Sequence, residues 1–327
     1  MDDGGKAMIK IFDFETCKRI GTKLPAESFY EWVDFALKNK AKFVMPAKTR
    51  IGQDNGDYYA CMPCMYEEEN LVCNKMIGRH GLKPGEKRTV MMSDLLLYEA
   101  DTGILKAVMD VEYITTLRTG AAAAHSAIMY AKKDFKTVGL FGLGNIMFAC
   151  IEVLMSQITD REITLKLYKY HNHEERFMEH FSKYPNVKFE LCDTYEETVR
   201  DSDLIISAVT RATEDFADDE CYKEGVTIIP IMTLGFQNCD LFFDKVFTDE
   251  IEQIRGFKYF NEFKSIANNT DVLLGEAEGR TNDKERILVY NYGLAIHDLY
   301  FAAQFYKNSL DEEKEIEYEY CKEKFFM

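Results

Sequence analysis

Two glycines separated by a single residue follow a short apolar run near the middle of the chain. The apolar run covers residues 138–141, the glycines are Gly142 and Gly144, and a helical pattern extends over about 145–157. Glycine permits a tight turn and leaves backbone N–H groups uncovered, and the start of the next helix carries a positive partial charge. The spacing therefore predicts a strand, a turn that can bind a phosphate group, and a helix.

This turn is only part of a dinucleotide-binding fingerprint. In the pattern G-x-G-x-x-G the third small residue is Met147 here, so an ordinary strand, turn and helix would explain the motif equally well. The preceding segment, Arg118-Thr119-Gly120 followed by four alanines, predicts a helix whose small side chains let it lie close to other backbone. Whether the turn belongs to a dinucleotide-binding site therefore has to be judged from the elements around it.

The residues after the turn alternate between strand and helix patterns. Strands are predicted over 163–168, 187–191, 204–209, 226–232 and 245–249. Polar helices are predicted near 174–182 and 195–200. Parallel strands need helical crossovers of this kind, so this part of the chain is expected to be a Rossmann-type, doubly wound α/β domain.

The first part of the chain has a different pattern. Apolar residues predict a helix that ends near Lys42. Short strands are predicted over 43–45, 58–62, 70–77, 89–98 and 104–109, the last two joined by the turn Asp101-Thr102-Gly103. Strands ahead of a βα series imply a separate, mainly antiparallel α+β domain. Near the other end a helix is predicted over 292–303, and the charged tail 311–319 is expected to be a solvated helix face.

Composition narrows the classes of partner. The 327 residues carry a formal net charge of −16, which argues against sequence-independent nucleic-acid binding and against an anionic membrane surface. Apolar runs are too short for a membrane span, and the N-terminus has no hydrophobic signal core. Nine cysteines, an odd number, indicate reduced thiols. A cytoplasmic protein that binds small molecules or proteins is expected.

A dinucleotide at the turn would contact three groups of residues. Its pyrophosphate would be held by the backbone of Gly142, Gly144, Asn145 and Ile146. Its adenosine or nicotinamide side would be flanked by Ala208, Val209 and Thr210. The residue that selects the ribose should lie roughly 20 residues after the turn, where Lys169 follows the predicted strand and no acidic residue ends it. A cation there favours NADP(H) over NAD(H), because it can pair with the 2′-phosphate.

A set of short motifs then occurs in a recognisable order. The motifs are Met62-Pro63, Asn74-Lys75, Asp101-Thr102-Gly103, Leu117-Arg118-Thr119-Gly120-Ala121-Ala122, Gly142-Leu143-Gly144, Leu274-Gly275-Glu276, Gly279-Arg280 and Gly293-Leu294-Ala295-Ile296-His297-Asp298. In this order they resemble the ornithine cyclodeaminase/mu-crystallin family over most of the chain. The resemblance implies a homodimer in which residues 1–120, completed by 293–327, bind substrate and mediate dimerisation, while residues 121–292 bind the dinucleotide.

The resemblance also implies active-site residues. Arg50 and Arg118 match arginines that bind the substrate carboxylate, a task that suits a planar guanidinium. For Arg50 a surface salt bridge is the simpler interpretation, whereas Arg118 is flanked by apolar and small residues. Lys75 matches a lysine that contacts substrate near the reacting carbon, where an ammonium can bind a carboxylate or polarise a C=O or C=N bond. Asp298 matches an aspartate on the closing helix that orients an active-site group.

Together these features predict an NAD(P)-dependent oxidoreductase that reduces a small imino or 2-oxo acid to an amino acid, or catalyses the reverse. The hydride would come from a nicotinamide cofactor whose contacts include Thr119 and Gly293, and the catalytic group would be Lys75, Arg118 and Asp298. A non-catalytic, NADP-bound ligand-binding protein is a second interpretation.

Cyclisation of ornithine or a related diamino acid is a third interpretation. Cyclodeaminases of the family have a glutamate two residues before the Met-Pro pair and an aspartate after the fifth-strand glycine, where this chain has Ala60 and Leu234. One carboxylate must hold the second nitrogen and another must move protons. The chain is therefore not expected to be an efficient cyclodeaminase, unless Asp240 takes the place of the missing aspartate.

No metal site is expected. Cys61 and Cys64 form a C-x-x-C pattern without a second pair, and they are interpreted as buried thiols. His171, His173 and His180 fall in a stretch that is expected to be a solvated loop.

Overall fold

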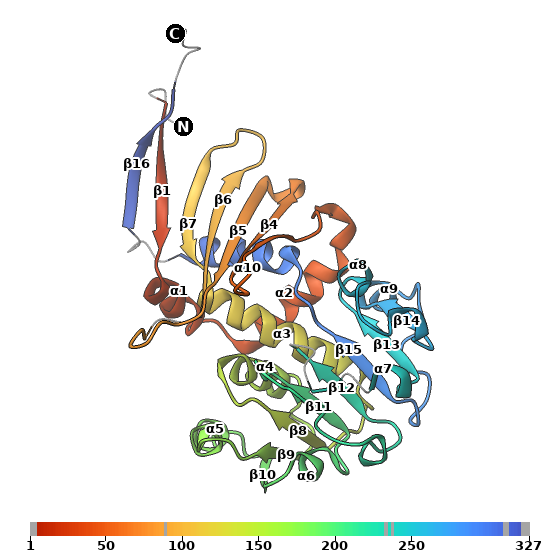
Figure 1. Cartoon of the computed structure of the whole chain (residues 1–327). Coiled ribbons are helices and arrows are strands. Elements are labelled where there is room, and N and C mark those ends of the chain that lie inside the picture. Colours follow the sequence, from red (N-terminus) through yellow and green to blue (C-terminus); the bar gives the residue numbers. More distant parts are fainter. Residues whose placement is uncertain (1–4, 88–89, 232–234, 237–238, 310–313, 322–327) are drawn as a thin grey trace. The chain divides into compact units, whose positions relative to one another are not determined.

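The computed structural model describes residues 5–87, 90–231, 235–236, 239–309 and 314–321 (Figure 1). The chain forms two compact units. The first unit consists of Met1–Pro25, Asn39–Thr115 and Ala295–Met327, and the second consists of Ala26–Lys38 and Thr116–Leu294. The boundary predicted at residue 120 thus falls between Thr115 and Thr116, and residues 26–38, expected in the first domain, belong to the second unit.

The first unit contains a mainly antiparallel sheet. Its strands are β1 (Lys6–Phe12), β2 (Phe43–Val44), β3 (Thr49–Gly52), β4 (Tyr58–Tyr66), β5 (Leu71–Arg79), β6 (Met91–Glu99), β7 (Leu105–Asp110) and β16 (Lys314–Glu319). Their order is β16-β1-β7-β6-β5-β4-β2, and β3 also pairs with β4. The strands β4 to β7 form a meander of antiparallel neighbours, as the sequence predicts for this region.

One face of this sheet is covered by helices. Along β5 the side chains of Leu71, Cys73, Lys75 and Ile77 are buried, because alternate residues of a strand share one face. The helix α10 (Ala295–Lys307) packs on β4, β5 and β6, and α1 (Phe14–Gly21) packs on β7 and α10. The period of two places Lys75 on the same buried face as its apolar neighbours.

Residues 314–319 of the charged tail form a strand, so the expectation of a helix was wrong for them, and residues 311–313 lie outside the described residues. β16 pairs antiparallel with β1, with Lys6 opposite Glu319, and Figure 1 shows the two strands as a ribbon at one end of the sheet. Charged and apolar residues alternate along β16, so that Ile316 and Tyr318 share one face. This period of two outweighs the charge density that suggested a helix. The partner strand β1 was not predicted from the sequence.

The second unit contains a parallel sheet. Its strands are β8 (Thr137–Phe141), β9 (Ile163–Tyr168), β10 (Val187–Cys192), β11 (Leu204–Ser207), β12 (Thr227–Pro230), β13 (Lys245–Thr248), β14 (Ile266–Asn268) and β15 (Ile287–Tyr290). They follow the order β10-β9-β8-β11-β12-β15-β13-β14. The strands β11, β12 and β15 are buried along their whole length, which is typical of a sheet covered on both faces. The predicted doubly wound α/β fold is confirmed.

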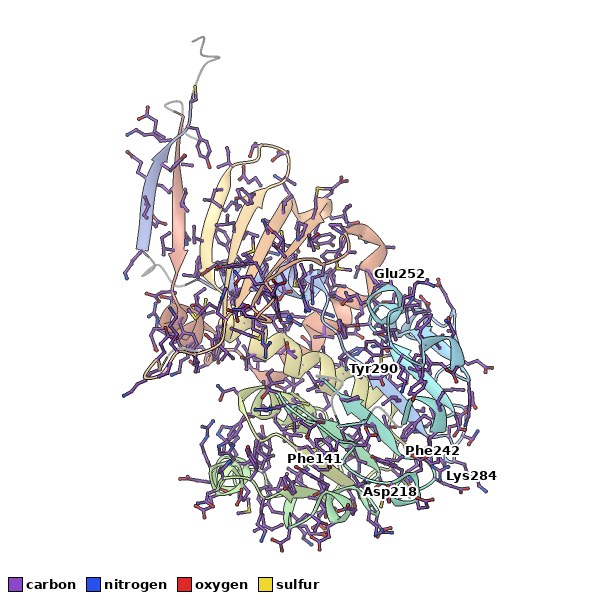
Figure 2. The ribbon with its side chains drawn as sticks, viewed as in Figure 1. Phe141, Asp218, Phe242, Glu252, Lys284 and Tyr290 are labelled. Atoms are coloured by element: carbon purple, nitrogen blue, oxygen red, sulfur yellow. The ribbon has the colours of Figure 1, made fainter. Side chains whose placement is uncertain are left out.

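Helices cover both faces of the parallel sheet. They are α2 (Ala26–Lys38), α3 (Glu112–Tyr130, which begins in the first unit), α4 (Asn145–Ser156), α5 (His173–Phe181), α6 (Tyr195–Val199), α7 (Cys239–Phe242), α8 (Ile251–Ile254) and α9 (Asn269–Leu273). A core on one face includes Phe141 and Tyr290, both labelled in Figure 2. Within the described ranges, no helix is long and apolar enough to cross a membrane.

Candidate active site

The glycine turn joins the carboxyl end of β8 to α4. Gly142 has a φ of +77°, and a Cβ at this position would lie 2.7 Å from the carbonyl carbon of Ala208. Ala208 is held there because it follows β11, and its N–H donates to the carbonyl of Phe141 at 2.9 Å. Both the backbone conformation and the available space therefore require glycine at position 142.

The start of α4 is open on the side of the turn. Gly144 is the N-cap residue and provides no side-chain cap, and a Cβ at Gly144 would have no heavy atom within 4 Å. The N–H groups of the first helical turn, including those of Asn145 and Ile146, have no acceptor within the helix. Uncovered N–H groups at the positive end of a helix dipole fit a pyrophosphate.

Met147 stands at the third position of the fingerprint, and a close contact in this region lies instead between α3 and α4, at Gly120. Met147 is fully buried in α4. Gly120, in α3, provides the close approach, since a Cβ on it would lie 2.5 Å from the backbone nitrogen of Cys150 and 2.7 Å from the Cβ of Ala149. The small residues of the Arg-Thr-Gly-Ala segment thus let α3 lie against α4, and Thr119 in this segment is half-buried.

Other predicted cofactor residues lie at the same edge of the sheet as the turn. Ala208, Val209 and Thr210 directly follow β11, and β11 is the neighbour of β8. Ala208 and Val209 are half-buried, whereas Thr210 is exposed. This edge is where open α/β sheets bind their ligands.

Lys169 also lies at this edge, but its ammonium is paired. The Nζ atom forms an ion pair with Asp193, which follows β10. The hydrogen bond to Asp193, together with the charges of Asp193, Glu174 and Glu197, raises the pKa of Lys169. Asp193 is beside Lys169 because β9 and β10 are parallel, with Tyr168 opposite Cys192. The prediction from the end of β9 alone did not include these carboxylates.

Arg118 and Gly293 lie together in the second unit. Arg118 is 7 % exposed, and a Cβ on Gly293, whose φ is +90°, would lie 2.7 Å from its Nη1 atom. Asp249, which follows β13 and is buried, accepts a 2.6 Å hydrogen bond from the N–H of Gly293. Arg118 is thus a buried guanidinium rather than a surface one. Asp249, which supports the Gly293 loop, was not singled out from the sequence.

A buried ammonium is the main feature of the first unit. Lys75 in β5 and Asp298 in α10 are 0 % and 1 % exposed, and Nζ of Lys75 donates to Oδ1 of Asp298 at 2.9 Å. The same ammonium donates to Oγ1 of Thr115 at 2.7 Å. The predicted residues Lys75 and Asp298 are therefore brought together, and Thr115 joins them although no sequence signal indicated it.

Two thiols lie near this pair. Cys64 in β4 is opposite Cys73 in β5, and both are buried. Burial, followed by the charge of Asp298, raises the pKa of Cys64 to about 12. Cys61 differs from the expectation of a buried thiol: it is half-buried on the other face of β4, since residues three apart in a strand point to opposite faces, and its Sγ donates to Asn74.

Arg50 lies in the exposed strand β3. It is opposite Ala60 of β4, and its guanidinium lies 4.1 Å from the centre of the Tyr58 ring. Lys75 is opposite Met62, further along β4. Ala60 is 1 % exposed and carries no group that could accept a proton.

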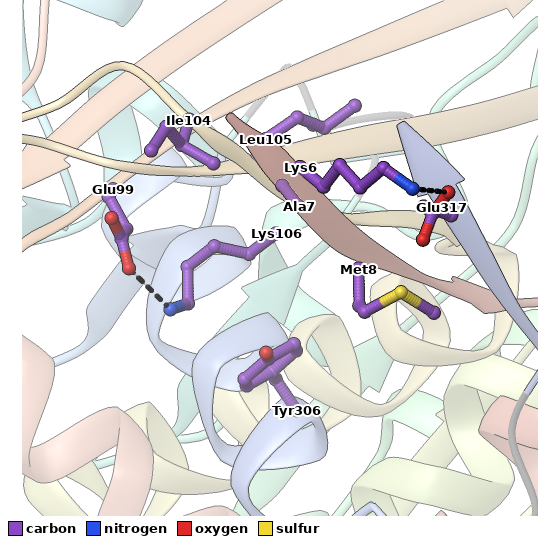
Figure 3. Close-up of a pocket in the computed structure, with 9 residues that line it drawn as sticks. All are labelled: Lys6, Ala7, Met8, Glu99, Ile104, Leu105, Lys106, Tyr306 and Glu317. Carbon is purple, nitrogen blue, oxygen red and sulfur yellow. Dashed lines mark hydrogen bonds and ion pairs between the residues drawn. The ribbon is translucent and has the colours of Figure 1, made fainter. Parts of the chain in front are cut away.

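The first unit also contains a cavity of about 290 Å³. Figure 3 shows it between β1, β7, β16 and α10, beside the ring of Tyr306. Its charged side chains form two ion pairs, Lys6 with Glu317 at 2.7 Å and Lys106 with Glu99 at 3.1 Å. The cavity contains none of the predicted site residues, and we assign the site from the buried charges instead.

Some predicted residues lie outside what the structure describes. Leu234 is not among the described residues, and for Asp240 only its position in α7 is described. His171 is exposed in the turn before α5, whereas His173 and His180, expected in a loop, lie in α5, where His173 is exposed and His180 pairs with Glu152. Among the described residues no group of three or more His, Cys, Asp or Glu side chains could hold a metal ion.

Comparison with known proteins identifies the family. The sequence model of the ornithine cyclodeaminase/mu-crystallin family matches residues 12–313. The chain belongs to this family. One relative is alanine dehydrogenase from Archaeoglobus fulgidus, which is 25% identical over 303 residues, covering 85% of this chain and 88% of the relative.

Solved structures of the family have the same fold. An archaeal alanine dehydrogenase dimer with bound NAD superposes with a TM-score of 0.83 at 22% identity, covering 95% of this chain and 99% of the other. Δ1-pyrroline-2-carboxylate reductase from Thermococcus litoralis, in complex with NADH and L-proline, has a TM-score of 0.80 at 19% identity, covering 94% and 100% of the two chains. At these identities the likeness supports the fold alone.

Proposed function

We propose that the protein is an NAD(P)-dependent oxidoreductase that reduces a small imino or 2-oxo acid to an amino acid, or catalyses the reverse reaction. The observation that carries this proposal is the buried pair of Lys75 and Asp298. Removing charges from water costs several kcal/mol per ion, so buried pairs of this kind are candidates for function. The family relatives support the reaction class, since they include alanine dehydrogenase and Δ1-pyrroline-2-carboxylate reductase.

Lys75 would act on the reacting bond of the substrate. Asp298 and Thr115 orient its ammonium. A 2-oxo acid would first condense with ammonia, losing water, to give the imine. The ammonium then donates a hydrogen bond to the nitrogen of the C=N bond and makes the carbon a better hydride acceptor. Asp298 would hold the ammonium in position. The nicotinamide group supplies or accepts the hydride when it is bound.

Arg118 and Arg50 would bind the substrate carboxylate. For Arg118 the support is that its guanidinium is buried and that Gly293 lies against it. We expect Arg118→Lys to raise the KM for the acid about tenfold or more while cofactor affinity stays the same, because lysine keeps the charge but cannot form two parallel hydrogen bonds. An unchanged KM, or loss of the fold, would argue against this role.

The cofactor is proposed to be NADP(H) in preference to NAD(H). The support is the sequence at the end of β9, where Lys169 follows Tyr168 and no acidic residue is present to accept a hydrogen bond from a 2′-hydroxyl. To contact a 2′-phosphate, Lys169 would have to exchange its pairing with Asp193.

A cytoplasmic homodimer is proposed as the working form. Apolar side chains remain exposed on strands of the first unit, among them Tyr59, Met76 and Met92, and such surfaces are typical of interfaces. The archaeal alanine dehydrogenase with the same fold is described as a dimer. Light scattering of the purified protein should give twice the mass of one chain, and a monomeric mass would contradict the proposal.

Turnover distinguishes this function from its alternatives. The absorbance of the reduced nicotinamide should change with small cyclic imines, with 2-oxo acids plus ammonia, or with free amino acids. Cofactor that binds but is never oxidised or reduced would support a ligand-binding protein. Rapid conversion of ornithine to proline, lost in Asp240→Asn, would support the cyclodeaminase, although Ala60 cannot supply one of the two carboxylates that this reaction needs.

A further inference from the structure

A second cation lies beside the phosphate-binding turn. Arg176 is in α5, and its Nη2 atom donates to Oδ1 of Asn145 at 3.3 Å. Asn145 is the first residue of α4 and follows the turn directly. No sequence signal relates Arg176 to the turn, because it comes from the helix after β9 and is 31 residues from Asn145. The ring contact between Phe148 of α4 and Phe177 of α5 brings the two together.

Aromatic contacts fix the position of this guanidinium. Its central carbon lies 4.7 Å from the centre of the Phe148 ring, one helical turn after Asn145. Phe148 in turn packs edge-to-face on Phe177 of α5 at 5.0 Å, and Phe177 is fully buried. A guanidinium stacked on an aromatic face keeps its N–H groups directed outward in the plane. Arg176 is an exposed side chain, and its contacts with Phe148 and Asn145 place it at the start of α4.

Arg176 and Lys169 differ in their surroundings. Lys169 is bonded to Asp193, and Glu174 and Glu197 also act on it. Within the described residues, no carboxylate lies within 4 Å of the Arg176 guanidinium; its polar contact is the neutral amide of Asn145. A phosphate that approaches this edge would have to displace a carboxylate from Lys169 but not from Arg176.

We propose that Arg176 is the residue that recognises the 2′-phosphate of NADP(H). The assignment rests on the proposed function and names the group that gives it its cofactor preference. A dinucleotide whose pyrophosphate lies at the turn has its adenosine ribose towards the end of β9, and Arg176 follows β9 by eight residues. Its planar fork can bind two phosphate oxygens at once, which the point charge of a lysine cannot.

The affinities of four proteins for three ligands test this assignment. Calorimetry would be carried out on the full chain, wild type and three variants, with NADPH, NADH and ADP-ribose. Arg176→Gln removes the cation, and Arg176→Lys keeps the charge without the fork. Arg255→Gln is the matched control, because Arg255 is exposed, pairs with Glu252 and follows α8, which comes after β13 on the other side of the sheet.

We expect the loss of the Arg176 cation to weaken the binding of NADPH alone. Arg176→Gln should weaken NADPH binding about tenfold or more, while the affinities for NADH and ADP-ribose change less than about twofold. The NADPH affinity of Arg176→Lys should fall between those of the wild type and Arg176→Gln. The NADPH affinity of Arg255→Gln should match that of the wild type. An unchanged NADPH affinity in Arg176→Gln would overturn the assignment, and an equal loss for NADH and ADP-ribose would move Arg176 to the pyrophosphate. A wild-type protein that binds neither NADPH nor NADH would overturn the proposed function itself.

Discussion

The Oδ1 atom of Asp298 lies 2.9 Å from Nζ of Lys75, and both side chains are removed from solvent. The two residues are 223 positions apart in the chain, one in β5 and one in α10. Because each charge neutralises the other in a medium of low dielectric, neither can be removed alone without leaving an uncompensated charge. This relationship makes the pair testable by stability as well as by turnover.

The first prediction concerns the cost of breaking this pair. Lys75→Met should lower the free energy of unfolding by about 3–5 kcal/mol, because the Asp298 carboxylate stays buried without the ammonium. The double variant Lys75→Met/Asp298→Asn should recover most of this loss but no activity. Urea denaturation measures the free energy of unfolding of the single and the double variant. Lys42→Met, which removes a lysine from an exposed pair with Glu68 in the same unit, should cost less than about 1 kcal/mol, and an equal cost for Lys75→Met would contradict the account.

The two glycines of the turn should respond differently to alanine. Gly142→Ala places a Cβ against the backbone of Ala208 at a positive φ, so we expect a loss of at least about 2 kcal/mol in stability and loss of cofactor binding. Gly144→Ala has free space around the Cβ and an ordinary extended backbone, so the fold should keep its stability while the added methyl weakens binding of the pyrophosphate. Thermal unfolding and calorimetry with NADH measure the two effects. Equal stability of both variants would show that the turn is not as close to Ala208 as described.

Arg280 is predicted to be structural. It makes five hydrogen bonds, to the carbonyls of Tyr130, Asn282, Glu285 and Gly225 and to the hydroxyl of Thr227. Arg280→Lys keeps the charge but cannot satisfy these acceptors, so it should destabilise the fold by about 2–4 kcal/mol. The specific activity of the folded fraction should not change. Arg255→Lys serves as the control, and if it is as destabilising as Arg280→Lys, the network has no special role.

The free energy of unfolding should also decrease in acid, because the Asp203 carboxylate becomes protonated. Burial acts to raise the pKa of its carboxyl, but hydrogen bonds from the backbone of Lys136 and Thr137 and from the ammonium groups of Lys223 and Lys132 hold it at about 2. A depressed pKa stabilises the fold above the unfolded value near 3.8, and the contribution disappears as the pH falls from there to about 2. With solvent screening the contribution is on the order of 1 kcal/mol. Asp203→Asn should therefore be less stable than the wild type at pH 6, and the difference should shrink at pH 2. A difference that is independent of pH would contradict this.

The local patterns of the sequence predicted most of the fold. The strand over 163–168 matches β9, and the helix near 174–182 is α5 within one residue. The strand–helix alternation predicted the parallel sheet, because each crossover is contained in a short stretch of sequence. The ordered motifs indicated Lys75 and Asp298, which the structure places in contact.

What the sequence could not predict depends on distant partners. The strand β16 is stabilised by β1, more than 300 residues earlier. Lys169 appeared to be an open cation because Asp193, its partner, lies at the end of the next strand. Arg176 could be related to the turn only once α5 was packed on α4. In each case a pairing between strands or helices, rather than the residue itself, decides what the side chain does.

Under the proposed function, hydride transfer takes place on a small amino or imino acid with the help of Lys75. The most direct measurement follows the absorbance of reduced nicotinamide with wild type and Lys75→Met against cyclic imines, 2-oxo acids with ammonia, and free amino acids. We predict turnover with at least one of these acids and a fall in kcat of about 10² or more in Lys75→Met, with cofactor affinity unchanged. A wild-type protein that binds the cofactor but turns over none of these compounds, or a Lys75→Met variant with normal kcat, would contradict the account.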